Sequence, residues 1–248
     1  MRIGISTAVK TKGENWDRMQ YLLKLGYKQI EFYNKITRIR MADIGPLIEL
    51  KESKGLSYSF HSMVQDLFCD DKIISRAEYY SLIAEIRLAS RLSCERVIFH
   101  ISKKTGLTKT ERKQLVRLAD FAKENKVKLC LENNFSSGYF SGSGLLDIVN
   151  NIKNLFFCLD LGHLNIAIQK GLISDEKIFI KEIRNKLEEI HLHHNNGEAD
   201  QHLVFDKRGL NFLSEILSIV SGKNIYLIIE TRNIKQAQKV KLQIQRYV

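Results

Sequence analysis

The feature that most constrains the fold is the alternation of short apolar runs with amphipathic segments along the chain. Eight runs of five or six residues are rich in aliphatic and aromatic side chains and bounded by polar ones, as buried parallel strands are. These runs are 2–6, 28–33, 56–61, 96–100, 127–132, 155–160, 189–193 and 225–230.

The segments between the runs have helical periodicity. Residues 14–26 end in Gly26, a suitable C-terminal cap, and carry one apolar face formed by Trp16, Met19, Leu22 and Leu23. Similar helical segments are 76–93, 108–125, with Thr110 and Glu111 near its start, and 208–222. Eight strand–helix units predict an α/β fold, a single (β/α)8 TIM barrel that spans 1–248 as one domain. The alternative is a doubly wound open sheet, but no GxGxxG follows the first run.

Charge and cysteine content restrict the class of protein. The net charge is +11 and the pI about 9.4, but lysines and arginines are spread over the chain, so a nucleic-acid partner is only a weaker alternative. The four scattered cysteines form no CxxC pair and are expected to be small buried side chains in a reduced compartment. The start, MRIGIST, has no apolar signal region, and no apolar run could span a bilayer. We therefore expect a cytoplasmic protein without membrane contact.

Groups that can bind metal or carry protons recur at the ends of the predicted strands. In a barrel these C-terminal ends meet at one face, where the chemistry is located. The groups at or near these ends are Glu31, His61, His100, Glu132, Asp160, His191 and Glu230. Their regular position predicts one shared polar site.

Histidines are concentrated in 187-LEEIHLHHNNGEADQH-202, which holds four of the seven in the chain. Asp160 and His163 can reach one cavity, and Asp200 and His202 point the same way if their loop is extended. Imidazole and carboxylate ligands without thiolate favour zinc, manganese or another divalent transition ion.

These motifs, in this order, resemble those of the xylose-isomerase-like barrels. That superfamily contains sugar and sugar-phosphate isomerases and epimerases, together with apurinic endonucleases of the second family. The resemblance covers nearly the whole chain and is carried by 59-SFHSMVQDL-67, 97-VIFHIS-102, 131-LENN-134, 158-CLDLGHLN-165, 190-IHLHHNNGEADQH-202 and 229-IET-231.

By position, the resemblance implies two sets of metal ligands. The four-ligand site shared by many members corresponds to Glu132, Asp160, His191 and Glu230. The further ligands, which complete a three-metal site in the apurinic endonucleases, correspond to His61, His100, His163, Asp200 and His202. We therefore expect a divalent metal cofactor, zinc or manganese, with positions for more than one ion per chain.

The first functional hypothesis is a metal-dependent isomerase or epimerase that acts on a sugar or sugar phosphate through an enediolate. Glu132 and Glu230 would exchange the substrate proton, and His163 would hold a hydroxyl or phosphate oxygen. The substrate would be a small anionic or neutral sugar. The groups expected to bind or attract it are His193, Lys103, Lys104, Lys207 and Arg232.

Two other classes remain open. The nine filled ligand positions and the basic charge support an apurinic/apyrimidinic endonuclease with a multinuclear zinc site, but the loops are short for inserting into duplex DNA. Residues 203–210 lack the Gly-x-Gly turn common in relatives, which keeps a non-catalytic or metal-storage protein open. His193 either lines the cavity or packs deeper, and His194 is expected to be solvated or to support a ligand.

Overall fold

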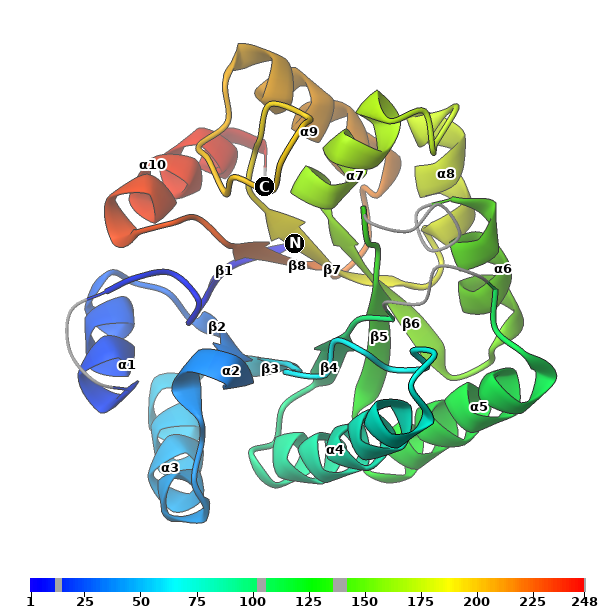
Figure 1. Ribbon diagram of the computed structural model, residues 1–248. Helices are drawn as coiled ribbons and strands as arrows, with labels where there is room; N and C mark the ends of the chain where they lie inside the picture. The colour runs from blue at the N-terminus through cyan, green and yellow to red at the C-terminus, as the bar shows by residue number, and fades with distance from the viewer. Residues whose placement is uncertain (12–14, 102–105, 136–141, 248) are drawn as a thin grey trace.

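Eight parallel strands form a closed barrel surrounded by helices in the computed structural model, which describes residues 1–11, 15–101, 106–135 and 142–247 (Figure 1). The strands follow the order of the chain, and β8 pairs with β1 to close the barrel. They are β1 (Arg2–Ser6), β2 (Gln29–Tyr33), β3 (Ser57–His61), β4 (Arg96–Phe99), β5 (Lys128–Glu132), β6 (Leu155–Asp160), β7 (Leu187–Leu192) and β8 (Tyr226–Ile229). The predicted (β/α)8 barrel is confirmed, because every predicted run overlaps one strand; β7 begins at Leu187, two residues before its predicted run.

Helices connect successive strands around the outside of the barrel. They are α1 (Asn15–Lys24), α2 (Asn34–Thr37), α3 (Ile44–Lys54), α4 (Lys72–Arg91), α5 (Lys109–Glu124), α6 (Ser143–Asn151), α7 (Leu161–Gln169), α8 (Glu176–Ile183), α9 (Lys207–Ile219) and α10 (Ile234–Ile244). Short 3-10 helices lie at η1 (Met41–Asp43) and η2 (Gln245–Tyr247). None of the helices within the described ranges is long and apolar enough to cross a membrane.

Two helix starts differ from those indicated by the sequence. Helix α4 begins at Lys72, four residues before the predicted segment, with the Asp71 side chain accepting from two backbone N–H groups. The pattern misses this first turn because Ile73 and Ile74 are exposed, so it has no apolar face. Helix α5 is capped by Thr108, which forms a reciprocal capping box with Glu111; Thr110 lies inside the helix.

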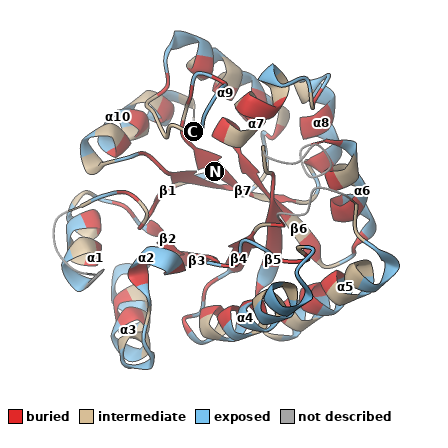
Figure 2. Cartoon of the chain, viewed as in Figure 1, coloured by how far each residue is buried: buried red, intermediate tan, exposed pale blue. Residues whose placement is uncertain are grey.

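The main apolar core lies between the barrel and its helices (Figure 2). Most outer helices contribute an inward apolar face to this core. Examples from six of them, all at most 1% exposed, are Leu22, Leu82, Leu118, Ile148, Leu213 and Val240. A smaller cluster of Ile98, Cys130 and Cys158 lies apart from it. Three of the four cysteines are buried and all four are free, which agrees with the expectation of small buried side chains.

Candidate metal centre

The four positions of the first predicted ligand set converge at the C-terminal ends of β5 to β8. Glu132 and Asp160 end their strands, His191 is the penultimate residue of β7, and Glu230 directly follows β8. The Nδ1 atom of His191 lies 3.2 Å from Glu132 Oε1, 3.7 Å from Glu230 Oε2 and 3.9 Å from Asp160 Oδ2. All four side chains are buried, so carboxylates and an imidazole share a volume largely closed to water.

Two further histidines face the same carboxylate from the other side. The Nε2 atoms of His61 and His100 lie 3.1 and 3.2 Å from Glu132 Oε2. These three groups place one potential ligand atom each within 4.8 Å of one another. Glu132 therefore stands between His191 and the His61–His100 pair, where a bridging ligand would be.

A third group forms around Asp200. Its Oδ2 atom lies 3.0 Å from His202 Nε2 and 3.6 Å from His163 Nε2. The ring of His193 stacks on that of His202 at 4.0 Å between centroids, and its Nε2 lies 2.9 Å from Asp160 Oδ2. His202 has a φ of 49°, a left-handed conformation that is uncommon outside glycine but that histidine, like asparagine and aspartate, adopts more readily than other residues.

Backbone carbonyls orient three of these rings. His61, His163 and His202 each place Nδ1 against a carbonyl oxygen, which can only accept, so Nδ1 carries the hydrogen. The accepting carbonyls belong to Ser62, Asn133 and Glu230. In all three rings Nε2 then faces the carboxylates, which is the arrangement a metal-binding histidine needs.

Burial and mutual attraction shift the pKa values of Glu132 and its neighbours. Burial alone would raise the pKa of Glu132, but attraction to His100 and His191 and the hydrogen bonds from histidines outweigh it and hold that pKa well below its usual range. Burial lowers the pKa of His61, yet the bond to Glu132 and the nearby carboxylates raise it to about 9. For His100 burial dominates and the pKa falls to about 4.

Burial and neighbouring charges also shift pKa values in opposite directions around Asp160. Burial would raise its pKa, but His163 and His193 lower it to about 2. Burial would lower the pKa of His163, but Asp160, Asp200 and Glu132 raise it to about 10. The cluster therefore keeps its carboxylates ionised by holding protons on neighbouring histidines, and a divalent cation could take over that role.

The donor set suits a divalent transition ion. Three groups each bring imidazole nitrogens and a carboxylate oxygen within 4.8 Å of one another, close enough to share one ion. These groups are His61–His100–Glu132, Asp160–His163–His193 and His193–Asp200–His202. The Asp200 Oδ1 and His193 Nδ1 atoms are buried, with no hydrogen-bond partner within the described part of the chain. A buried polar atom without a partner calls for an explanation, and a bound ion supplies one for Asp200.

A layer of charge lies beneath the cluster; it contains Glu31, which the sequence placed among the strand-end groups, and Arg96 and Glu189, which were not predicted as part of the site. Glu31 and Glu189 are fully buried, and their carboxylates lie 3.1 and 3.4 Å from His191 Nε2. Arg96 Nη1 lies 3.4 Å from Glu189, and its guanidinium packs 3.5 Å from the Tyr226 ring centroid. Charged residues inside apolar strand runs, at 31, 96 and 189, were the signal in the sequence. Burial raises the pKa of Glu31 to about 8, against the lowering influence of His191, so Glu31 needs a nearby donor or cation to stay ionised.

The remaining predicted residues lie in different places. Lys103 and Lys104 fall outside the described residues. Arg232 lies at the rim, where its Nε donates to the Gln201 carbonyl at 2.7 Å. His194 lies outside the cluster, partly buried, with Nε2 3.4 Å from Asp206 Oδ1. Lys207 begins α9.

A cavity of about 540 Å³ opens directly onto the cluster. It is lined by Ala8, Lys10, His202, Glu230, Thr231, Arg232 and Asn233. Because Glu230 and His202 belong to both the cluster and this cavity, the cavity borders the cluster and offers room for a small molecule beside it.

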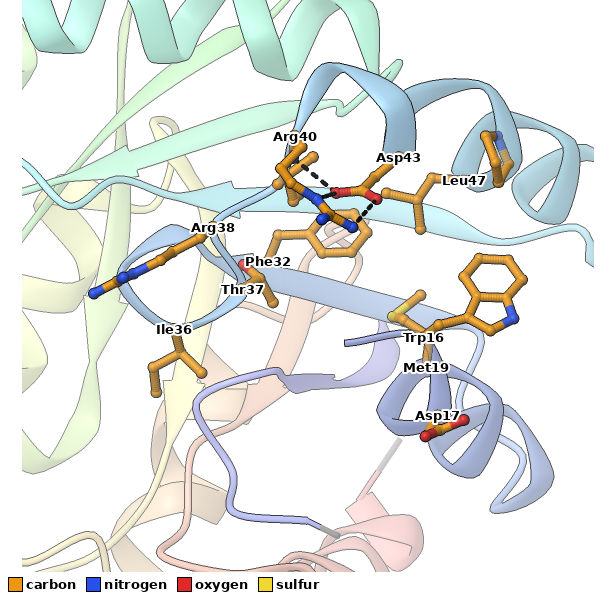
Figure 3. A pocket seen from close by; sticks show the side chains of 12 residues that line it. Trp16, Asp17, Met19, Phe32, Ile36, Thr37, Arg38, Arg40, Asp43 and Leu47 are labelled. Atoms are coloured by element: carbon orange, nitrogen blue, oxygen red, sulfur yellow. Dashed lines mark hydrogen bonds and ion pairs between the residues drawn. The ribbon is translucent and has the colours of Figure 1, made fainter. Parts of the chain in front are cut away.

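Another cavity, of about 750 Å³, lies away from this chemistry (Figure 3). It is bordered by α1, β2 and the segment from α2 to α3, and its polar groups include the Arg40–Asp43 ion pair. Trp16, Met19, Phe32 and Leu47 provide apolar walls. It shares no lining residue with the histidine cluster.

Fold and site together define a class: a (β/α)8 barrel with an imidazole–carboxylate cluster at the C-terminal ends of its strands. The chain belongs to the xylose isomerase-like TIM barrel family, whose sequence model matches residues 19–246. This confirms the family resemblance seen in the sequence.

Individual relatives agree with this assignment. Two uncharacterised proteins of Methanocaldococcus jannaschii, MJ1311 and MJ1614, are 29% and 28% identical over 143 and 176 residues. These matches cover 54% and 66% of this chain, and 47% and 66% of the relatives. A solved D-tagatose 3-epimerase-like protein superposes with a TM-score of 0.83 at 22% identity, covering 100% of this chain and 97% of that one. The IolI protein with a bound zinc atom gives a TM-score of 0.79 at 14% identity, covering 100% and 99%. The structural likenesses establish the fold.

Proposed function

We propose that this protein is a divalent-metal-dependent isomerase or epimerase that moves a proton on a sugar or sugar phosphate. The observation that carries the proposal is the convergence of Glu132, Asp160, His191 and Glu230 on one buried volume beside an open cavity. Several solved barrels of the same fold are named as sugar epimerases, among them an L-ribulose 3-epimerase with a TM-score of 0.71. We further propose that residues 1–248 act as one domain in the cytoplasm, where the four free cysteines would stay reduced.

The four converging side chains would hold a zinc or manganese ion. When bound, the ion would act as a Lewis acid on adjacent sugar oxygens and stabilise the negative charge that develops as a proton leaves carbon. His61, His100, His163, Asp200 and His202 supply further donors, so we propose positions for more than one ion per chain.

Two carboxylates would move the substrate proton, and their surroundings differ. Both oxygens of Glu132 are engaged by histidines, at 3.1 and 3.2 Å on Oε2 and 3.2 Å on Oε1. Glu230 borders the open cavity and lies no closer than 3.7 Å to His191 Nδ1. We therefore assign removal of the proton to Glu230 and delivery of a proton to the other side of the carbon to Glu132. Because Glu132 is ionised, it would first take that proton from protonated His61, whose Nε2 lies 3.1 Å from Glu132 Oε2.

The substrate would enter beside basic and hydroxyl groups. Lys10, Thr231 and Arg232 line the cavity next to Glu230, and could hold a phosphate or several sugar hydroxyls. His163 would bind a substrate oxygen through Nε2, because its Nδ1–H is held by the Asn133 carbonyl at 2.9 Å. A small anionic or neutral sugar meets these requirements, and we retain Lys103 and His193 as further residues that bind or position it.

The test is metal content followed by proton exchange. Purified protein is analysed for transition metals, loaded with zinc or manganese, and incubated in deuterated water with a panel of ketoses and their phosphates. We expect at least one ion per chain and deuterium at a single substrate carbon, detected by NMR. A metal-loaded protein that exchanges no proton on any member of the panel would refute the isomerase assignment.

An endonuclease is the second candidate, and one observation favours it. The groups His61–His100–Glu132 and His193–Asp200–His202 flank the four-ligand volume, and would give a multinuclear zinc site suited to hydrolysing phosphodiesters. Cleavage of duplex DNA at an abasic site by the zinc-loaded protein, with strongly salt-dependent binding, would establish this activity instead.

A further inference from the structure

The ring of His191 connects two layers of charge inside the barrel. Its Nδ1 faces the carboxylates of the proposed metal centre, with Glu132 Oε1 at 3.2 Å. Its Nε2 points away from that centre, toward Glu31, whose Oε2 lies at 3.1 Å. His191 and Glu31 are both 0% exposed, so water does not compete for this contact.

A neutral imidazole carries one hydrogen, and its position decides whether the ring can bind a metal. If Nδ1 is to offer its lone pair to an ion, the hydrogen must be on Nε2, and a buried N–H needs an acceptor. In His61, His163 and His202 a backbone carbonyl accepts from Nδ1 and leaves Nε2 toward the carboxylates. In His191 the roles of the two nitrogens are exchanged: Nδ1 faces the carboxylates of the proposed metal centre, and the acceptor at Nε2 is a side chain.

Glu31 is better suited than its neighbour Glu189 to accept the hydrogen of His191 Nε2. Glu189 lies at 3.4 Å from the same nitrogen but is already bound by Arg96 Nη1 at 3.4 Å and by Ser59 Oγ at 3.3 Å. The second oxygen of Glu31, Oε1, is buried with no hydrogen-bond partner within the described ranges. A buried carboxyl with so little support costs stability, so its presence calls for an explanation.

We propose that Glu31 is a positioning residue, which holds His191 with its hydrogen on Nε2 so that a bare Nδ1 faces the metal ion. This inference rests on the proposed metal centre. It adds a residue from β2, 160 positions earlier in the chain, to a site formed by β5 to β8. A carboxylate that accepts a hydrogen bond from a ligating histidine also raises the basicity of that histidine. Removing such a partner typically weakens metal binding about 10- to 100-fold.

Two substitutions at Glu31 and one control separate hydrogen bonding from charge. Glu31→Leu removes the acceptor at similar volume. Glu31→Gln keeps an oxygen that can accept from Nε2–H but loses the charge. Glu189→Gln removes a carboxylate at a similar distance from the same nitrogen, and keeps an acceptor for Arg96.

Metal dissociation constants for zinc and manganese are measured by chelator competition, and the tautomer of His191 by long-range ¹⁵N–¹H correlation spectra of the metal-free protein. We expect Glu31→Leu to weaken binding about 100-fold and lose the Nε2–H signal. Glu31→Gln should weaken binding about 10-fold and keep that signal, while Glu189→Gln should stay within about threefold of the wild type.

Each outcome decides the proposal. Equal weakening by Glu31→Gln and Glu189→Gln would show that buried charge alone matters, and would overturn the assignment. So would a Glu31→Gln variant that binds metal as tightly as the wild type while the His191 hydrogen lies on Nδ1, a measurement that remains decisive if Glu31→Leu fails to fold. If the wild type binds no metal, the metal centre is refuted, and the Nε2–H signal still reports whether Glu31 orients His191: a hydrogen on Nδ1 in the wild type overturns the inference.

Discussion

Replacing Gly162 with alanine tests how tightly the cluster is packed. Gly162 lies in the first turn of α7, and a Cβ atom there would be 1.9 Å from His193 Cε1. Ordinary van der Waals contact begins near 3.4 Å, so the ring would have to move by about 1.5 Å, the difference between these distances. The ring has no free space for this, because it stacks on His202 at 4.0 Å and is held by Asp160 at 2.9 Å.

Three contributions set the size of the effect. Overpacking costs about 1–3 kcal/mol, and losing the bond between His193 and Asp160 about 1 kcal/mol more. Alanine is favoured over glycine within a helix by about 1 kcal/mol, which offsets part of the cost. We expect Gly162→Ala to reduce the free energy of unfolding by about 2 kcal/mol and to lower Tm by roughly 4–8 °C.

A double-mutant cycle identifies the cause. With His193→Ala the methyl group introduced by Gly162→Ala enters the emptied space, so that substitution should be neutral there, or stabilising by up to about 1 kcal/mol. Urea and thermal unfolding of the four metal-free proteins measure the cycle. An equal loss in both backgrounds would refute the reasoning, because it would show that the clash with His193 is not what the substitution creates.

Three further predictions concern catalysis, stability and reactivity. Glu230→Gln should fold normally but exchange the substrate proton about 10²–10⁴-fold more slowly at saturating metal, as measured in deuterated water; exchange at the wild-type rate would exclude a proton-transfer role. Arg96→Met should lower the free energy of unfolding by about 3–5 kcal/mol, because it leaves Glu189 as a buried charge without its partner; urea denaturation at neutral pH measures the loss, and an unchanged midpoint would contradict it. Burial raises the pKa of the thiols other than Cys69, so at pH 8 they carry no thiolate and a thiol reagent should modify only the partly exposed Cys69; mass spectrometry would show two or more rapid additions if this is wrong.

The sequence alone was sufficient to predict the barrel and the face that bears the cluster. Eight apolar runs bounded by polar residues define parallel strands, and the C-terminal ends of such strands meet at one face of a barrel whatever their separation along the chain. Glu132, Asp160 and Glu230 therefore had to lie at the same face of the barrel. The family resemblance then implied the nine ligand positions, and the structure brings these side chains together, although their role as ligands remains a prediction.

Only the tertiary structure decided how the rings are oriented and what supports them. The contact between Glu31 and His191 joins residues 160 positions apart, and depends on the stagger of strands around the closed barrel. Likewise, His193 lies beside Asp160 because α7 presents Gly162 where a larger residue would exclude the ring. Local patterns report which face of a strand is apolar, but hydrogen-bond partners across a barrel depend on distances of a few tenths of an ångström, which are set by the packing of all eight strands together.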